Sequence, residues 1–289
     1  HMISRVAPTN SRVLITGEPG SGKEVVARQI HNQSSRAEAP FMVLNCAVMR
    51  PDRLETELFG AEAGVEGGDV HPGVLEQANG GTLLLAEVGD MALETQSKIV
   101  SVLQDQYFHR VGGQEALQAD VRILASTNQN LHDAMDRQEF RQDLFYRLSV
   151  VPIEVPALRQ RESDIPLLAR HFMQEFAEAN GHRPREFSQS ALTAMQAYTW
   201  PGNVRQMRNI VEWLIIMGEA DNDEAIHAAD LPSDFGQQQE QPDLNHHPWQ
   251  LANMPLRQAR EAFERDYLVA QMQRFDWNIS KTAEFIGME

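Results

Sequence analysis

The 289-residue sequence predicts an α/β domain with a parallel β-sheet, followed by smaller all-helical parts. Up to about residue 155 short apolar runs alternate with helical patterns, and from residue 156 the pattern is helical only. Strands that alternate with helices favour a parallel sheet covered by helices on both faces. The expected strands are 13–16, 41–45, 82–85, 121–126 and 150–155, and the expected helices lie near 22–34, 51–59, 92–105 and 130–147.

A glycine-rich segment, GEPGSGK at 17–23, joins the first expected strand to the first expected helix. This is the context of a phosphate-binding P-loop, because glycines let a loop turn its N–H groups toward a phosphate and the helix N-terminus adds positive charge. The alternative is a Gly/Pro turn with a surface lysine. The residues expected to bind the nucleotide are Gly17, Glu18, Gly20, Ser21, Gly22, Lys23, Glu24 and Val25.

A P-loop NTPase also needs carboxylates at the end of a neighbouring strand. The run GGTLLLAEV at 80–88 supplies Glu87 as the candidate water-activating carboxylate, but Ala86 stands where the metal-holding Asp is usual. Glu24 likewise replaces the Ser or Thr that most P-loops place on Mg²⁺. We therefore expect ATP or ADP as the ligand, Mg²⁺ binding weakened by Ala86, and little or no hydrolysis. The alternative is a buried strand whose Glu87 caps the next helix.

Other polar residues extend this candidate site. Thr127 and Asn128 follow the next strand at the same sheet edge, where they could contact the γ-phosphate or the water, although Ser-Thr-Asn also favours a plain loop. Arg141 and Arg147 are six residues apart and do not share a helical stripe, so one or both could reach a neighbour's nucleotide as arginine fingers. Arg205 opens a later helix, from which it could reach back to the phosphates.

The second half of the chain reads as several smaller parts. Helices are expected to start at Ser163, Ser188 and Gly202. A helical pattern after Pro255 and a short one ending at Gly287 resemble the beginning of a helix-turn-helix, although core packing alone would explain them. The expected domains are an α/β nucleotide-binding subdomain at 3–155, a helical lid at 156–235, a polar linker at 236–250 and a truncated DNA-binding domain at 251–289.

Two local patterns complete the reading. The segment FHRVGG at 108–113 predicts a hairpin arm with a Gly-Gly turn. His246 and His247 lie in the linker without a nearby Cys or His at ligand spacing, so no metal site is expected there.

Composition limits the class of protein. The net charge is −16, which disfavours nonspecific nucleic-acid binding, and no apolar run is long enough to span a membrane. The single cysteine, Cys46, fits a reducing cytosol, and no secretory signal is visible, so a cytoplasmic location is expected. His1 and Met2 look like a cloning remnant, which suggests a piece of a longer protein.

Together these motifs resemble the AAA+ domain of bacterial enhancer-binding proteins, the sigma-54-dependent activators, over roughly residues 5–235. The matching segments are 17–24, 44–47, 57–60, 80–88, 140–148 and 200–208. The resemblance implies a three-layer P-loop AAA+ domain with a helical lid, and a Fis-type DNA-binding domain after it. It also assigns roles: Lys23 to the phosphates, Glu87 to the water, Asn45 to a switch holding Glu87 inactive, Thr127 and Asn128 to sensor I, Arg141 and Arg147 to the fingers, and Arg205 to sensor II.

Segments 5–11, 148–152 and 278–289 narrow the resemblance to nitrogen-related response regulators of that family. This implies a receiver domain before residue 3, a sensor kinase as its partner, and DNA as a second partner. One departure concerns the loop by which activators engage sigma-54. Its Ala-Phe-Thr-Gly-Ala tip is replaced by VEGGDV at 65–70, so no contact with sigma-54 is expected.

Three functions are compatible with these features. The leading hypothesis is a transcription regulator of a two-component system in which ATP or ADP binding is regulatory and the chain forms a dimer or a ring. The second is a working ATPase ring that remodels RNA polymerase, and the third is a vestigial scaffold that dimerises on DNA. Nucleotide titration separates the third from the first, and turnover separates the second from both.

Overall fold

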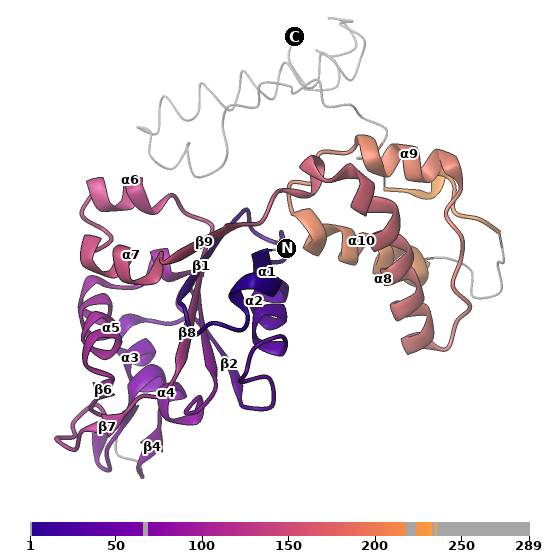
Figure 1. The fold of residues 1–289 in the computed structure, drawn as a ribbon. Coiled ribbons are helices and arrows are strands. Elements are labelled where there is room, and N and C mark those ends of the chain that lie inside the picture. Colours follow the sequence, from indigo (N-terminus) through magenta and orange to yellow (C-terminus); the bar gives the residue numbers. More distant parts are fainter. Residues whose placement is uncertain (1, 66–68, 218–223, 233–234, 236–289) are drawn as a thin grey trace, which may run out of the picture. The chain divides into compact units, whose positions relative to one another are not determined.

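The computed structural model describes residues 2–65, 69–217, 224–232 and 235 (Figure 1). Contacts divide the chain into two units, His1–Phe235 and Gly236–Glu289, and the description below concerns the first. The expected linker at 236–250, with His246 and His247, and the expected C-terminal helices lie outside the described residues.

Five parallel strands form the central sheet in the order β2-β5-β8-β1-β9. They are β1 Val13–Thr16, β2 Phe41–Asn45, β5 Thr82–Ala86, β8 Arg122–Thr127 and β9 Val151–Glu154. Each strand begins and ends within one residue of its expected position, so the predicted parallel sheet is confirmed. Because the strands are parallel, the residues that follow β1, β5 and β8 meet at one edge.

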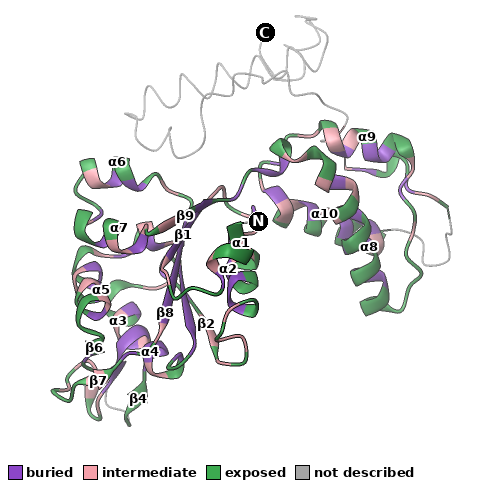
Figure 2. Ribbon diagram, viewed as in Figure 1, coloured by how far each residue is buried: buried purple, intermediate pink, exposed green. Residues whose placement is uncertain are grey.

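Helices cover both faces of this sheet, with α1 and α2 on one side and α3 to α7 on the other (Figure 1). Alternation along the strands explains this: Leu83 and Leu85 join the core on one face, and Leu84 joins the core on the other. All three are fully buried, and purple predominates in β1 and β8 at the middle of the sheet (Figure 2). These helices are α1 Met2–Val6, α2 Lys23–Asn32, α3 Pro51–Phe59, α4 Val74–Gln77, α5 Leu93–Asp105, α6 Leu131–Asp136 and α7 Gln142–Leu148.

The single helix expected near 130–147 is wrong, because α6 and α7 are separate. Gln138 lies between them with a φ of 59°, a left-handed conformation that a right-handed helix cannot contain. Phe140, also between them, is 3% exposed and packs into the core beside α7. The segment is helical on both sides of the break, as its periodicity predicts. The break itself comes with the burial of Phe140 in the core, which periodicity does not reveal.

Two short hairpins extend from the other end of the sheet, away from the carboxyl edge. β3 Gly60–Ala61 pairs with β4 His71–Pro72, and β6 Tyr107–Phe108 pairs with β7 Leu117–Gln118. The hairpin expected around residues 108–113 is therefore present as β6 and β7. Its connection, however, spans 109–116 and is longer than a Gly-Gly turn. The reason is that its first part lies against β3: the Val111 N–H donates to the Gly60 carbonyl at 2.9 Å, and Arg110 forms ion pairs with Glu62 and Glu76.

The helical subdomain comprises α8 Ile165–Asn180, α9 Gln189–Ala197 and α10 Asn203–Met217 around a separate hydrophobic core. Ser188 caps α9 as predicted, its hydroxyl accepting from the Ala191 N–H at 3.3 Å, and α10 follows Gly202 directly. The expected start of α8 at Ser163 is wrong. A 3-10 turn, η4 Glu162–Asp164, comes first, and Asp164 takes the N-cap position. The other 3-10 turns are η2 Val88–Asp90, η3 Leu158–Gln160 and η5 Ala228–Asp230.

Trp200 lies at the centre of the helical core and is fully buried. Its indole N–H donates to the Met195 carbonyl at 2.7 Å, and its ring meets Tyr198 edge to face. A buried tryptophan combines a large apolar surface with a satisfied polar group.

Replacing Trp200 with alanine should lower the free energy of unfolding by about 3–5 kcal/mol, since it leaves a cavity and removes a hydrogen bond. Urea unfolding followed by circular dichroism measures this loss. Trp213→Ala is the matched control, because Trp213 is 40% exposed on α10 and its loss should cost much less. Equal losses for the two variants would show that Trp200 does not organise this core.

Candidate functional site

The loop between β1 and α2 has the backbone form that the glycine-rich sequence predicts. Gly20 and Gly22 adopt φ values of 75° and 105°, which favour glycine. A Cβ on Gly20 would lie 2.4 Å from the Gly202 carbonyl oxygen, so glycine also permits close approach of α10. At Gly22 a Cβ would meet nothing within 4 Å, which leaves open space beside the first turn of α2.

Lys23, the first residue of α2, turns back into this loop and is only 7% exposed. Its ammonium donates to the Gly17 carbonyl at 2.9 Å and lies 3.2 Å from a carboxylate oxygen of Glu87. The burial of this lysine would be costly without these partners. The structure therefore brings the end of β5 against the P-loop lysine, as expected of a nucleotide site.

Glu87 follows β5 with a φ of 54°, a left-handed conformation that is uncommon outside glycine. Its second carboxylate oxygen accepts from the Asn128 N–H at 2.9 Å. Lys23, Glu87 and Asn128 thus meet at one point. Thr127 is fully buried, and its hydroxyl accepts from the Gln129 N–H rather than facing the loop.

No hydrogen bond joins the side chains of Asn45 and Glu87 in the described part of the chain. Its side-chain oxygen accepts from the Ala47 N–H at 3.0 Å, and its backbone is paired with Ala86 in the sheet. Asn45 therefore lies one strand away from Glu87, at the same edge, but Lys23 holds the carboxylate instead. The switch role expected for Asn45 stays a prediction.

Arg141 and Arg147 both lie at α7 and are not brought to the P-loop of their own chain. Arg141 forms an ion pair with Asp143 at 2.7 Å, and the hydrogen bonds from Arg141 lower the pKa of that carboxyl. Arg147 donates to the Gln104 side chain at 3.0 Å. An arginine finger acts on the nucleotide of a neighbouring copy of the chain, so these roles also stay predictions.

The lid helix α10 contacts the P-loop through its first turn. The N–H groups of Val204 and Arg205 both donate to the Gly20 carbonyl, at 3.0 and 3.4 Å. The exposed side chain of Arg205 extends from this turn, where sequence reasoning expected it. The Asn203 side-chain amide donates to Glu18 at 3.0 Å and to the Pro19 carbonyl at 3.1 Å.

Two arginines from the segment after β9 complete this contact. Arg159 donates twice to the Glu18 carboxylate, and Arg161 donates to the Ser21 carbonyl at 2.6 Å. Sequence reasoning missed Arg159, Arg161 and Asn203. One signal was present: two arginines stand shortly after the last strand, at the edge where the P-loop lies. Side-chain hydrogen bonds therefore hold the P-loop against the lid, in addition to the covalent connection of the chain.

The Glu18 carboxylate accepts hydrogen bonds from both Arg159 and Asn203 in this contact. Hydrogen bonds from Arg159 and then Asn203 lower the pKa of its carboxyl from 4.5 to about 2. A group whose folded pKa is depressed contributes stability above its unfolded pKa, and that stability is lost as the pH falls through the folded pKa. The loss should therefore lie between about pH 4.5 and about pH 2.

Glu18→Gln should accordingly flatten the dependence of the free energy of unfolding on pH over this window. Its side chain is 39% exposed, so solvent screening makes the effect small. Urea unfolding at several pH values from 6 down to about 2.5 measures it. The control is Glu38→Gln, an exposed glutamate with no ion pair among the described residues. An acid dependence identical to that of the unmodified chain would contradict the role of Glu18.

The loop fits a nucleotide on the evidence of its own atoms. Ser21 is 1% exposed, and its hydroxyl has no hydrogen-bond partner among the described residues. The first amides of α2 have no acceptor within the helix, and Gly22 provides no side-chain cap. Together with Lys23 these groups form a cradle for phosphate.

The same site offers Mg²⁺ few ligands. Ala86 offers no ligand, and Glu24, in place of the usual hydroxyl residue, is paired with Arg28 at 3.0 Å. Asp90, the nearest other carboxylate in sequence, accepts from the Gln129 amide at 2.6 Å. Within the part of the chain that the structure describes, no three His, Cys, Asp or Glu side chains are grouped to hold a metal.

Among the described residues, no helix has both the length and the apolar character needed to cross a bilayer.

Family models match three consecutive parts of the chain. The sigma-54 interaction domain matches residues 1–154, the AAA+ ATPase lid domain matches 159–248, and the Fis family of bacterial regulatory proteins matches 259–289. The predicted AAA+ architecture with a lid and a Fis-type domain is thus confirmed.

Individual relatives agree with these models. The chain is 48% identical over 287 residues to the nitrogen assimilation regulatory protein NtrX of Azorhizobium caulinodans, and 41% identical over 289 residues to a putative NtrX-like response regulator of Rickettsia typhi. These matches cover 99% of the chain but only 63% and 61% of the relatives, so the chain spans less than two thirds of their length.

Solved structures of NtrX from Brucella abortus resemble this chain closely. The complex with ATP has a TM-score of 0.77 at 51% identity and covers 99% of this chain, and the complex with ADP has a TM-score of 0.78 at 50% identity and covers all of it. Each match covers 63% of the solved chain. The chain belongs to the sigma-54 interaction domain family of AAA+ bacterial enhancer-binding proteins, and within it the chain is NtrX-like.

Proposed function

We propose that this chain is the nucleotide-responsive AAA+ region of a nitrogen-related, two-component transcription regulator. ATP or ADP binds at residues 17–25, and the bound nucleotide sets the position of the lid and thereby the presentation of the DNA-binding domain. Supporting this, NtrX of Brucella abortus, about half identical to this chain, has been solved with ATP and with ADP.

The single observation that carries the proposal is the direct contact between the P-loop and the lid. Gly20 accepts hydrogen bonds from the first turn of α10, and Glu18 is held by Arg159 and Asn203. A phosphate entering the loop changes the electrostatic surroundings of Glu18 and competes for Lys23. Nucleotide occupancy therefore acts on the same few groups that hold the lid.

Within this function the expected residue roles are retained as proposals. Lys23 contacts the phosphates, Arg205 reports the nucleotide from the lid, and Glu87 orients water. Asn45 holds Glu87 in an alternative state, and Thr127 and Asn128 sense the γ-phosphate. Arg141 and Arg147 act on the nucleotide of a second copy in a dimer or ring. Hydrolysis is slow because Ala86 leaves Mg²⁺ poorly held.

Hydrogen exchange of the first turn of α10 tests the regulatory claim. Saturating ADP should change the exchange of the Val204 and Arg205 amides, because their acceptor lies in the nucleotide loop. Lys23→Ala, at the same ADP concentration, should reduce the change. Unaltered exchange in the unmodified chain despite measured ADP binding would contradict regulation through the lid and favour a scaffold.

The same family suggests a polymerase-remodelling function, which the loop after Glu62 does not favour. Segment 65–70 lacks the aromatic-threonine tip, and residues 66–68 of it lie outside the described residues. The hairpins beside it are short and joined to one another by Arg110. We propose that DNA, through residues 251–289, and a sensor kinase, through a receiver domain, are partners of the whole protein, and that sigma-54 is not.

The full-length regulator should therefore fail to drive open-complex formation by sigma-54 polymerase in a purified system. A sigma-54 activator that carries the intact tip serves as the positive control on the same template. Robust open-complex formation by this regulator would show that another surface makes the contact.

A further inference from the structure

A polar cavity lies at the opposite edge of the sheet from the P-loop. It has a volume of about 530 Å³ and is lined by residues that precede or begin β1, β8 and β9, and by the end of α5. The amino ends of parallel strands meet there, whereas the nucleotide loop follows the carboxyl end of β1. The cavity is therefore separate from the proposed nucleotide site.

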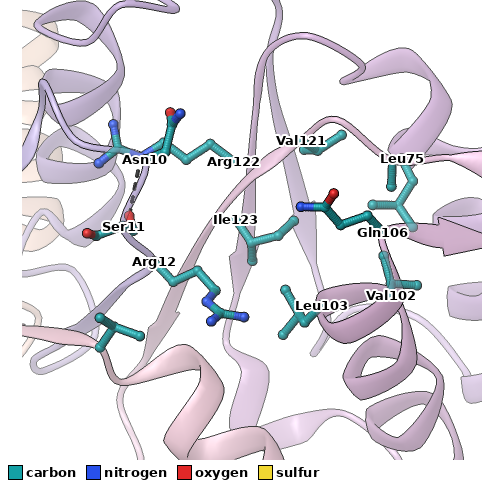
Figure 3. Close-up of a pocket in the computed structure, with 12 residues that line it drawn as sticks. Asn10, Ser11, Arg12, Leu75, Val102, Leu103, Gln106, Val121, Arg122 and Ile123 are labelled. Carbon is teal, nitrogen blue, oxygen red and sulfur yellow. Dashed lines mark hydrogen bonds between the residues drawn. The ribbon is translucent and has the colours of Figure 1, made fainter.

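Arg12, immediately before β1, enters this cavity. Its side chain extends toward Leu103, while that of Arg122 turns toward Asn10 and Ser11 (Figure 3). Arg122 is satisfied by three backbone carbonyls, those of Val6, Ala7 and Ser11. Arg12, in contrast, is half-buried and its guanidinium makes no hydrogen bond or ion pair with any described residue.

The surroundings of Arg12 are positive in a strongly acidic chain. The residues that line the cavity include two arginines and no aspartate or glutamate, although the whole chain has a net charge of −16. Partial burial and then the nearby Arg147 lower the pKa of Arg12. Arg147 itself donates to the neutral Gln104 amide, and among the described residues it has no ion pair.

An arginine that is partly removed from water without an acceptor is unfavourable by itself. Its planar fork matches an oxyanion, to which it can donate two hydrogen bonds. Gln106, at the other side of the same lining, contributes a further amide (Figure 3). A cavity of this volume is in the range of small-ligand sites.

We propose that this Arg12 cavity binds a phosphate-type oxyanion, held by the fork of Arg12 with Arg147 nearby. The phosphate comes either from a free small molecule or from a nucleotide presented by a second copy of the chain. The second source depends on the proposed function, because it requires a nucleotide at the P-loop of the neighbour, whereas the first does not.

Calorimetric titration with inorganic phosphate tests the site, in a Lys23→Ala background that disables the P-loop and at constant ionic strength set with chloride. Saturable binding is expected. Adding Arg12→Gln should weaken it about tenfold or more, and Arg12→Lys should weaken it less, since it keeps the charge but loses the fork. Arg170→Gln, which removes an exposed arginine of α8, should leave the affinity unchanged. Circular dichroism confirms that each variant is folded.

Absence of saturable phosphate binding in the Lys23→Ala chain, or equal affinity with and without Arg12, would overturn the proposal. The two sources are then separated by sedimentation of chains with an intact P-loop in the presence of ATP. If Arg12→Gln weakens phosphate binding but leaves association unchanged, the ligand is a free anion. If it lowers association as well, a neighbour's nucleotide supplies the phosphate.

Discussion

Lys23→Ala should weaken the binding of ATP and of ADP about 10- to 150-fold. The ammonium is held in the loop by the Gly17 carbonyl and by Glu87, and it is only 7% exposed, so it is already positioned where a phosphate would lie. A hydrogen bond to a charged group contributes about 1.5–3 kcal/mol, which sets this range. Isothermal titration calorimetry of both nucleotides measures it.

The matched control is Lys98→Ala. Lys98 lies on α5 and, like Lys23, forms an ion pair with a glutamate, in this case Glu55 at 2.6 Å. It is far along the chain from the loop, and its loss should leave nucleotide affinity unchanged. Removing Lys23 also leaves Glu87 without its ion-pair partner, so the stability of each variant is compared by urea unfolding. Equal affinities of the Lys23→Ala and unmodified proteins would reject the nucleotide site.

Ala86→Asp should raise ATP turnover about tenfold or more and make it dependent on Mg²⁺. The end of β5 already places Glu87 beside Lys23 and the Asn128 amide, so the candidate water-orienting carboxylate is present. The preceding position, Ala86, has no carboxylate that could hold the metal. Phosphoryl transfer depends mainly on positioning and charge stabilisation, so restoring that ligand should affect the chemical step more than nucleotide binding.

Ala86→Asn is the control, because it has nearly the size of Asp without its charge. Phosphate release is measured at saturating ATP over a range of protein concentrations, since Arg141 and Arg147 would act only between copies. Asn should leave turnover low, and Asp should raise it. Fast Mg²⁺-dependent hydrolysis by the unmodified chain would contradict the account, and would point to another carboxylate, such as Asp90, as the metal ligand.

The parts of this site that are local in sequence could be predicted. Glycine spacing at 17–23 defines a loop conformation directly, and the apolar runs before the loop and before Glu87 are long enough to identify parallel strands. Because the carboxyl ends of such strands share an edge, the proximity of Lys23, Glu87 and Asn128 follows from fold class alone. The alternating burial of Leu83, Leu84 and Leu85 follows from the same argument.

The contacts between distant segments could not be predicted. Glu18 meets Arg159 and Asn203 across more than 140 residues, and nothing in the periodicity of either segment specifies that pairing. The break between α6 and α7 likewise depends on the left-handed Gln138 and on the burial of Phe140, which are tertiary features. That the guanidinium of Arg12 has no partner among the described residues is visible only once its neighbours are placed.

We expect the chain to bind adenine nucleotide at the P-loop without requiring a firmly held metal. Calorimetric titration of ADP into the unmodified chain, with Mg²⁺ and with a chelator, tests it most directly. The account predicts saturable binding under both conditions with nearly the same affinity, because Lys23 and the loop amides supply the phosphate contacts and Ala86 offers the metal nothing. No binding under either condition, or binding only when Mg²⁺ is present, would contradict it.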